Sequence, residues 1–350
     1  MTSPDLPLVS VLIPAYNAQA TLRETVESAL GGTYPNVEIV IVDDGSTDHT
    51  AWIATELSAD PRVRVVRQSN RGLPGALNAA LAGARGEFVA RLDADDLWHP
   101  TKLAKQVELA LQKDAPDFIY TFYRYIDDGG RVLFDGPPQR FPPRAFRRSI
   151  YETLIGTGSS MLMRRATMEG LGGFDETFRN SEDLLFQIKT AARHKIGFVA
   201  EYLVGYRLHP RSLSQDASAM RNVWRDLRPR LKEISPHVPA KVHDWAHARR
   251  SMGMAEGFAR RRRGKDTLRL LWTALRHDPL WSSAFLIYRA GRWITRTRFQ
   301  SPKAGRPFFE YDPTEAIDPV SDLYGTEGRL MGRLHRRRTS LLATLDASDS

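Results

Sequence analysis

Short apolar runs alternate with helical segments in the first hundred residues, and this alternation constrains the fold more than any other feature. Each run is rich in Val and Ile and is bounded by turn residues, so we predict a buried strand at each. Strands separated by helices form right-handed crossover units around a parallel sheet. The predicted strands span residues 9–14, 37–42, 63–66 and 88–92, and the helices between them span 20–29, about 47–57 and 73–84.

Local signals indicate where two of these helices begin. Thr21 and Glu24 have the spacing of a capping box, in which side chains satisfy the first backbone N–H groups of a helix. Ser46 or Thr47 can supply the N-cap of the second helix. Beyond residue 100 we predict helices at 103–111 and 182–192, strands at 118–125, 159–163 and 198–208, and a Pro- and Gly-rich loop at 129–148.

These patterns predict an α/β fold, with a mostly parallel central sheet flanked by helices, and an α-helical C-terminal extension. The α/β domain is expected over residues 1–215, with halves at about 1–100 and 101–215. Helical periodicity and clustered Arg predict a basic helical region over 216–335. The polar end, 336–350, is expected to be a flexible tail.

The chain is basic and contains no cysteine. Its 50 Lys and Arg against 41 Asp and Glu give a formal net charge of +9, which suits phosphate-bearing substrates or an anionic membrane surface. No nucleic-acid recognition module accompanies the charge, so nucleic acid is not an expected partner. Without cysteine there is no disulfide and no thiolate metal site. No signal peptide and no run of roughly 20 apolar residues is found, so we expect a cytoplasmic protein that can dock on the cytoplasmic face of the membrane.

Three carboxylates follow the fourth predicted strand: Asp93, Asp95 and Asp96, with Ala94 between the first two. Ligands of parallel sheets bind at the carboxyl ends of the strands, which is where this cluster lies. Adjacent carboxylates repel one another unless a cation intervenes, and oxygen ligands suit Mg²⁺ or Mn²⁺ bridging to a diphosphate. The alternative is a solvated acidic turn before the helix that Pro100 begins.

Two further loops lie at the same predicted edge. Asp44, after the second strand, can accept hydrogen bonds from a base or a ribose, and its alternative role is to form an ordinary turn. The loop after the first strand offers backbone groups and an aromatic ring to a nucleotide, or it simply joins strand to helix. Its residues are Pro14, Ala15, Tyr16 and Asn17.

The ordered series of motifs resembles the inverting family-2 glycosyltransferases with the GT-A fold. It covers roughly residues 8–215 and includes the segments 9–17, 41–48, 70–72, 92–96, 172–176, 181–183, 206–209 and Ser212. The resemblance implies that residues 14–17, Asp44 and Arg71 hold the nucleotide. It implies that Asp93, Ala94 and Asp95 serve the donor sugar and a Mn²⁺ or Mg²⁺ ion, with His209 near the metal or diphosphate.

The same resemblance implies a general base, and small and hydroxyl-bearing residues suggest an acceptor site. Asp183 is the implied base, although Ser181, Glu182 and Asp183 could instead cap the helix that follows. Glu182, Gly158 and Ser159 are candidates for the acceptor side, although the Gly- and Ser-rich run could equally be a loop.

The sequence also departs from the family pattern in two places. Leu77 stands where the family often has Arg, so that contact is missing or is supplied by Arg91. No Gln-x-x-Arg-Trp motif of the processive members is present, which favours transfer of a single sugar.

The resemblance implies a nucleotide-diphosphate sugar, with UDP as the common nucleotide, and a glycan or lipid-linked acceptor of cell-surface polysaccharide or glycolipid synthesis. Two rivals remain. A sugar nucleotidyltransferase usually has a Gly-rich basic loop after its first strand, which residues 15–18 lack. A non-catalytic scaffold of the same fold would not need Asp93, Asp95 and Asp183 together.

The basic C-terminal part carries aromatic residues close to Arg clusters. Segments 268–275 and 281–293 follow the charge run 260–263. Such a sequence is typical of an interfacial helix on an anionic leaflet, and equally of a helical cap packed on the rest of the protein.

Overall fold

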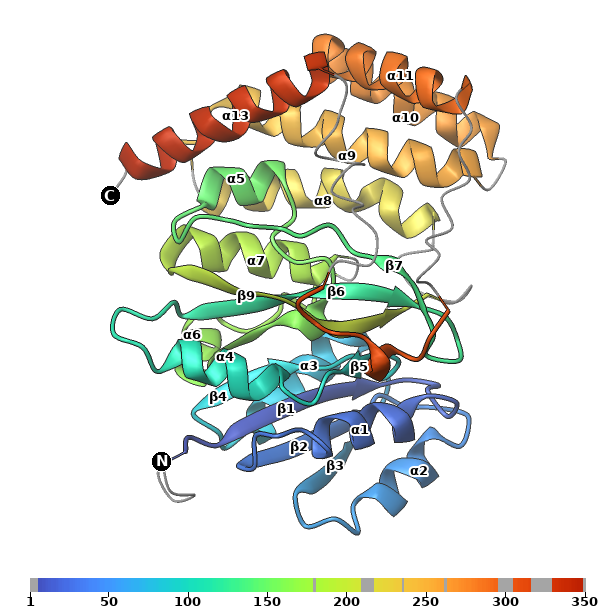
Figure 1. The fold of residues 1–350 in the computed structure, drawn as a ribbon, viewed down its shortest axis with the longest axis vertical. Helices are drawn as coiled ribbons and strands as arrows, with labels where there is room; N and C mark the ends of the chain where they lie inside the picture. The colour runs from blue at the N-terminus through green and yellow to red at the C-terminus, as the bar shows by residue number, and fades with distance from the viewer. Residues whose placement is uncertain are drawn as a thin grey trace. The chain divides into compact units, whose positions relative to one another are not determined.

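The computed structural model describes residues 6–178, 181–208, 217–234, 236–260, 263–294, 305–315 and 329–348. The chain forms two compact units (Figure 1). The first comprises Met1–Pro143, Ile155–His209 and Pro302–Asp318. The second comprises Arg144–Leu154, Pro210–Ser301 and Pro319–Ser350.

Among the described residues, nine strands form one mixed sheet in the first unit, in the order β3-β2-β1-β4-β8-β6-β9-β5, with β7 paired to β6. The four predicted strands of the first hundred residues are present and mutually parallel. The strands are β1 (Val9–Ala15), β2 (Val37–Asp43), β3 (Val63–Arg67), β4 (Phe88–Arg91), β5 (Leu97–Trp98), β6 (Phe118–Ile126), β7 (Val132–Asp135), β8 (Leu162–Arg164) and β9 (Ile196–Arg207).

The second half of the sheet differs from the predicted parallel arrangement. β8 runs antiparallel to both β4 and β6, β5 pairs antiparallel with β9, and β7 pairs antiparallel with β6. Only the β6–β9 pair is parallel there. Helical crossovers enforce parallel pairing only in the first hundred residues, so the α/β prediction is confirmed while the sheet as a whole is mixed.

Helices cover the sheet and bury its apolar residues. Alternate residues of β1, namely Val9, Val11 and Ile13, belong to a fully buried core with residues of α1, α2 and α4. The helices and short 3₁₀ turns of this unit are α1 (Leu22–Leu30), α2 (Thr50–Leu57), α3 (Gly72–Gly83), α4 (Lys102–Ala110), η2 (Gly158–Ser160), α6 (Arg165–Gly170), α7 (Glu182–Arg193) and η4 (Phe308–Glu310).

Both predicted helix caps are wrong. The Thr21 hydroxyl donates to the Ala94 carbonyl at 2.8 Å instead of capping α1. α2 begins at Thr50, whose N–H donates to Asp48 Oδ1 at 2.9 Å. Ser46 is used elsewhere, since its Oγ accepts from the Asn17 N–H at 3.0 Å. Polar groups with the spacing of caps thus join separate loops at the edge of the sheet.

The second unit is helical, as the extension was predicted to be, but its boundaries differ from those predicted. α5 (Phe146–Tyr151) lies near the end of the predicted loop and contacts α9 and α13. Residues 305–315, by contrast, return to the first unit, where the Val132 N–H donates to the Arg306 carbonyl at 2.9 Å. The remaining helices are α8 (Ala217–Ile234), α9 (Ala240–Arg260), α10 (Gly264–His277), α11 (Pro279–Ile294) and α13 (Arg329–Ser348).

Much of the expected flexible tail is helical, because α13 extends to residue 348. Arg338 on this helix is buried, donates from Nη2 to Asp278 at 3.0 Å and lies over the Trp245 ring. Leu342 is fully buried. None of the helices in the described part of the chain is long and apolar enough to cross a bilayer.

Candidate active site

The carboxyl ends of β1 and β2 bring the first predicted loops together. Pro14 and Ala15 lie in β1 beside Val42 and Asp43 of β2. Asn17 follows with a positive φ of 50°, and its Oδ1 accepts from the Thr47 N–H at 2.9 Å. The Tyr16 side chain is 52% exposed beside this junction. The two loops therefore form a fixed edge with one aromatic ring open to solvent.

Asp44 shapes the neighbouring loop. Its buried carboxylate accepts from the Arg71 N–H at 2.8 Å and from Gln68 Nε2 at 2.7 Å, both at Oδ1. Gly45 has φ of 76°, and a Cβ there would lie 2.9 Å from the Asn70 nitrogen. Asp44 thus connects the ends of β2 and β3 through contacts that sequence alone did not predict.

The Arg71 guanidinium is paired within the protein. Its Nη2 lies 2.9 Å from both carboxylate oxygens of Glu176, while Asn78 Nδ2 donates to Glu176 at 3.1 Å. The hydrogen bond from Asn78 and the charge of Arg71 lower the pKa of Glu176. The Arg71 side chain is nevertheless 50% exposed.

Arg91, at the end of β4, joins two predicted site residues. Its Nε and Nη2 donate to Asp93 at 2.7 and 3.1 Å, and its Nη1 donates to Glu182 at 2.9 Å. Arg91 and Glu182 are buried, whereas the Asp93 side chain is 23% exposed. Burial raises the pKa of Glu182 to about 7, with Arg91 opposing and the Asp183 charge adding to the rise. Burial likewise raises the pKa of Asp93, against the effect of Arg91.

Asp96 has a structural role. It is fully buried, and it accepts from Ser159 Oγ at 2.6 Å, Thr157 Oγ1 at 3.1 Å and the Arg207 N–H at 3.0 Å. Its pKa is raised well above the usual range by burial, followed by repulsion from Asp95 and Asp93. Asp96 is therefore held inside the protein by these three hydrogen bonds, whereas Asp93 and Asp95 are partly exposed.

Main-chain contacts hold the rest of this turn. The Ala94 carbonyl accepts from Thr21 and Thr25 at 2.8 and 3.0 Å. The Asp95 carbonyl accepts from Arg207 Nε at 2.7 Å. The Asp95 side chain is partly exposed. Asp93 and Asp95 consequently present their carboxylates from a fixed backbone.

Asp183 lies on the first turn of α7, after Ser181, which has a positive φ of 60°. Its Oδ1 accepts from the Leu184 N–H at 2.7 Å. The Ser181 side chain makes no cap hydrogen bond, whereas Asp183 accepts from a first-turn N–H, as the capping alternative expects. Asp183 is partly exposed and interacts electrostatically with Arg91 and Glu182. His209 and Ser212 lie outside the described residues.

All three acceptor candidates are buried supports of the carboxylate turn, which corrects the acceptor role predicted for them. Ser159 is fully buried; its hydroxyl accepts from the Asp93 N–H at 3.0 Å and donates to Asp96. Gly158 is buried against Arg91, and a Cβ there would lie 2.5 Å from its guanidinium carbon. Glu182, also buried, is held by Arg91. All three therefore stabilise the carboxylate turn, and Ser159 and Glu182 have their polar groups engaged inside the protein.

Sequence reasoning missed the role of Arg207, the residue with the most extensive contacts at this site. Its buried guanidinium donates to the carbonyls of Asp95, Asp127 and Asp128, and its Nη2 lies 2.7 Å from a Glu24 oxygen. A charged residue at the end of an apolar aromatic strand was the available signal, because buried Arg needs several acceptors.

The carboxylate pair suits a divalent cation. Among the residues that the structure describes, no three His, Cys, Asp or Glu side chains gather into a metal cage. Mg²⁺ and similar hard cations commonly bind through one or two carboxylates and complete their shell with substrate phosphates and water. Asp93 and Asp95 can supply this partial set of oxygen ligands.

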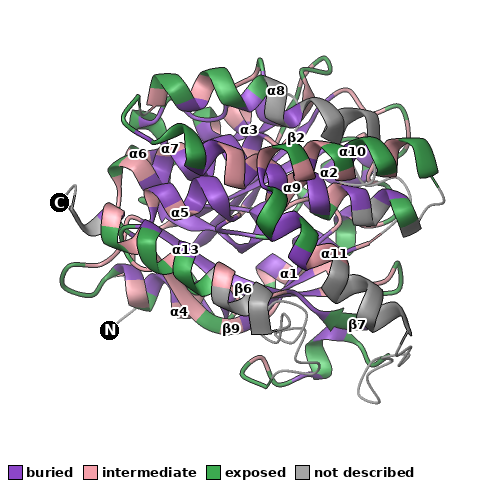
Figure 2. Ribbon diagram, turned by 90° about the horizontal axis from the view of Figure 1, so that it is seen from above, coloured by how far each residue is buried: buried purple, intermediate pink, exposed green. Residues whose placement is uncertain are grey.

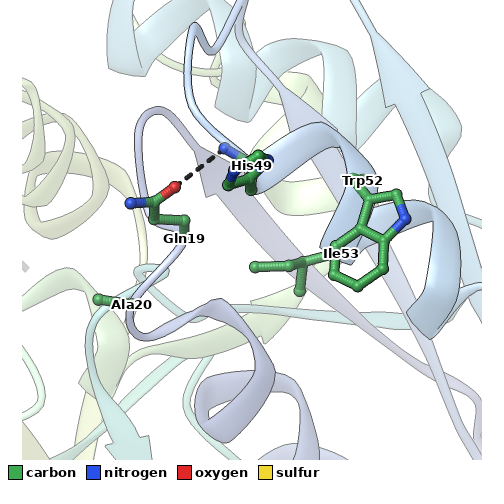
Figure 3. Close-up of a pocket in the computed structure, with 5 residues that line it drawn as sticks. All are labelled: Gln19, Ala20, His49, Trp52 and Ile53. Carbon is green, nitrogen blue, oxygen red and sulfur yellow. Dashed lines mark hydrogen bonds between the residues drawn. The ribbon is translucent and has the colours of Figure 1, made fainter.

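The first unit also has a surface hollow, and none of the carboxylates named above lines it (Figure 3). Its lining residues are Gln19, Ala20, His49, Trp52 and Ile53. Gln19 Oε1 accepts from the His49 N–H at 3.0 Å. The hollow is therefore formed by the loop after β1 and by the start of α2 together with its preceding residue His49.

Comparisons with known proteins agree with this architecture. Residues 10–172 match the model of glycosyl transferase family 2. The putative teichuronic acid biosynthesis glycosyltransferase TuaG of Bacillus subtilis is 34% identical over 62% of this chain and 86% of its own length. An uncharacterized glycosyltransferase of Rickettsia prowazekii is 31% identical over 63% of this chain and 70% of its own length. Chondroitin synthase of Escherichia coli is 36% identical over 53% of this chain and 26% of its own.

Solved structures share the fold. S. aureus TarS 1–349 in complex with UDP-GlcNAc has a TM-score of 0.57 and 19% identity, over 89% of this chain and 99% of that one. Mannosyltransferase PcManGT from Pyrobaculum calidifontis, with GDP-Man and Mn²⁺, has a TM-score of 0.53 and 22% identity, over 82% and 81%.

A mixed α/β sheet with carboxylates at the end of β4 is the architecture of the GT-A class. With these relatives, the chain belongs to glycosyl transferase family 2. It spans 64% of the length of an uncharacterized glycosyltransferase from Rickettsia typhi and 36% of one from Rickettsia felis.

Proposed function

We propose that this protein is an inverting, metal-dependent glycosyltransferase that moves a single sugar from a nucleoside-diphosphate donor to an acceptor hydroxyl. The observation that carries the proposal is the Arg91 bridge, which fixes Asp93 at the end of β4 and holds Glu182 next to Asp183. Rigid placement of carboxylates at this edge is what a donor site in an α/β sheet requires.

The donor nucleotide would bind along the edge formed by the loops after β1, β2 and β3. The exposed Tyr16 ring can contact the base, and the loop that Asp44 holds presents Arg71 toward a phosphate or a ring. We propose a UDP-sugar as the first donor to test, because UDP is the family's common nucleotide and the fold relative TarS was solved with UDP-GlcNAc.

The reaction is a displacement at the anomeric carbon. The acceptor oxygen forms the new bond to that carbon while its proton passes to the Asp183 carboxylate. The bond from the carbon to the diphosphate oxygen breaks, and the nucleoside diphosphate leaves with the electron pair. Attack from the face opposite the leaving group inverts the anomeric configuration.

Charge accumulates on the leaving diphosphate, so cationic groups must be placed in advance. Asp93 and Asp95 would hold a Mn²⁺ or Mg²⁺ ion that neutralises this charge when bound. The manganese in the PcManGT complex supports this choice. Arg91 is occupied by Asp93 and Glu182, so its role is to set carboxylate positions, and it does not replace the arginine missing at Leu77 by binding substrate directly.

The names of two relatives, TuaG and chondroitin synthase, point to polysaccharide acceptors. We therefore propose a glycan or lipid-linked acceptor, used in the cytoplasm in the synthesis of a surface polysaccharide or glycolipid. A non-catalytic scaffold is the main rival. It would not require the partly exposed Asp183 beside the fixed carboxylates.

Nucleotide binding tests the donor site directly. Thermal shifts would be measured with a panel of nucleoside diphosphates, with and without Mn²⁺, on wild type, Asp95→Ala and the exposed control Glu108→Ala. A ligand that binds only the folded state raises the melting temperature. We expect a Mn²⁺-dependent shift with one nucleotide, lost in Asp95→Ala and kept in the control. No shift with any nucleotide from folded wild type would overturn the donor-site assignment.

The donor sugar and stereochemistry need a second measurement. The donor supplied is the α-linked nucleoside-diphosphate sugar of the nucleotide that binds. The anomeric proton of the product is then observed by NMR. A β-linked product supports inversion, and an α-linked product contradicts it.

A further inference from the structure

The outer face of α10 exposes large apolar side chains, and packing against neighbouring helices does not explain them. Leu268 and Trp272 are 70% and 69% exposed, the highest values among the large apolar residues the structure describes. They are four residues apart, so they lie one above the other on the same side of the helix. Figure 2 shows the exposed residues of α10 in green.

The opposite face of α10 accounts for its packing. Leu270 and Ala274 are buried and belong to clusters with residues of α9 and α11. At 100° per residue these two positions lie roughly opposite Trp272. Leu268 and Trp272 therefore take no part in the core of the second unit.

Basic residues flank this apolar pair. Lys265, Arg269 and Arg276 are exposed and, from helical geometry, occupy the same third of the helix surface as Leu268 and Trp272. The acidic residue of this helix, Asp266, is turned aside and paired with Arg263 at 2.9 Å. Leu280, at the start of α11, is 59% exposed just beyond the end of α10.

Large apolar side chains bordered by Lys and Arg match a surface that is both negatively charged and apolar beneath. An anionic phospholipid leaflet has this structure: Trp and Leu enter the boundary between headgroups and acyl chains, while the cations contact the headgroups. A nucleic acid would attract the cations but offers no place for Leu268. An acidic protein would need a complementary apolar groove.

We propose that the outer face of α10 docks this protein on an anionic phospholipid membrane through Leu268 and Trp272, with Lys265, Arg269 and Arg276 on the headgroups. The proposal goes beyond sugar transfer and does not depend on it. Its test contains neither nucleotide nor acceptor, so failure of one idea is distinguishable from failure of the other.

The experiment is co-sedimentation of the full chain with vesicles of phosphatidylglycerol and phosphatidylcholine, compared with pure phosphatidylcholine. We expect binding only to the anionic vesicles. Leu268→Ser with Trp272→Ser should weaken partitioning at least about tenfold, because two large apolar side chains no longer enter the bilayer boundary. Arg269→Gln and Arg276→Gln should each weaken it about fivefold, and added salt should weaken it further.

Trp52→Ser is the matched control, since Trp52 is 59% exposed but lies on α2 of the first unit. It should bind vesicles as wild type does, and circular dichroism confirms that every variant is folded. The proposal is overturned if wild type does not bind anionic vesicles, or if the Leu268/Trp272 variant still binds them. Loss of self-association in that variant, without vesicle binding by wild type, would instead assign this face to a second copy of the chain.

Discussion

Arg91 donates to both carboxylate oxygens of Asp93, with Nε 2.7 Å from Oδ1 and Nη2 3.1 Å from Oδ2. The third nitrogen of the same guanidinium donates to Glu182 at 2.9 Å. A planar guanidinium can make these three contacts at once, and a lysine cannot. The turn after β4 and the start of α7 are therefore connected through one buried cation.

Arg91→Met should lower the free energy of unfolding by about 3–5 kcal/mol, because it leaves Glu182 and Asp93 without their buried cation. Urea unfolding followed by circular dichroism measures the change. Arg23→Met is the control: Arg23 pairs with Glu56 at the surface, and such pairs contribute at most about 1 kcal/mol. Equal losses in the two variants would contradict the bridging role of Arg91.

Gly158→Ala should cause a large loss of the transfer rate with only a modest loss in the free energy of unfolding. Its Cβ would meet the Arg91 guanidinium at 2.5 Å, so the guanidinium must shift and Asp93 with it. Overpacking of this kind costs about 1–3 kcal/mol, whereas a carboxylate misplaced by about 1 Å can cost on the order of 10²-fold in rate.

Gly170→Ala provides the comparison for this prediction, because a Cβ at Gly170 has no neighbour within 4 Å. Initial rates and melting temperatures are measured on both variants. If Gly158→Ala keeps the wild-type rate, contact between Gly158 and Arg91 is not needed to place Asp93.

The sequence predicted the first half of the sheet because each strand there is a separate apolar run with a helix after it. It also located Asp44, Asp93 and Asp95 at the correct edge, since residues that follow parallel strands share one side of the sheet. It could not show that Ser159 supports Asp96, because the two are 63 residues apart and only tertiary packing pairs them. The contacts of Arg207 with Asp95 and Glu24 were hidden for the same reason.

Asp183→Asn tests the proposed general base. The change keeps the size of the side chain but removes its capacity to take a proton, so kcat should fall by about 10²–10⁴. Nucleotide-induced thermal shifts should stay at the wild-type level. Asp175→Asn, in the preceding loop where Asp175 accepts from the Thr177 N–H at 2.9 Å, should leave kcat unchanged. A near wild-type kcat for Asp183→Asn would show that another group accepts the proton.

A buried lysine predicts an unusual pH dependence of stability. Lys102 of α4 is fully buried; its Nζ donates to Gln106 Oε1 at 2.7 Å and lies 3.9 Å from the Trp98 ring centroid. Burial lowers the pKa of Lys102 well below its usual range. The unfolded chain keeps this proton up to about pH 10.4, whereas the folded protein releases it at lower pH.

Between those two pKa values the unfolded state binds more protons, so the contribution of Lys102 makes the free energy of unfolding rise with pH, by at most about 1.4 kcal/mol per unit. Lys102→Met removes this contribution. The variant also loses the hydrogen bond to Gln106, but the free-energy cost of that loss does not depend on pH. Urea unfolding at pH 7, 8 and 9 should therefore show that wild type gains stability relative to Lys102→Met as pH rises. The exposed control Lys113→Met should run parallel to wild type. A constant difference between wild type and Lys102→Met across this range would mean that Lys102 stays charged in the folded protein.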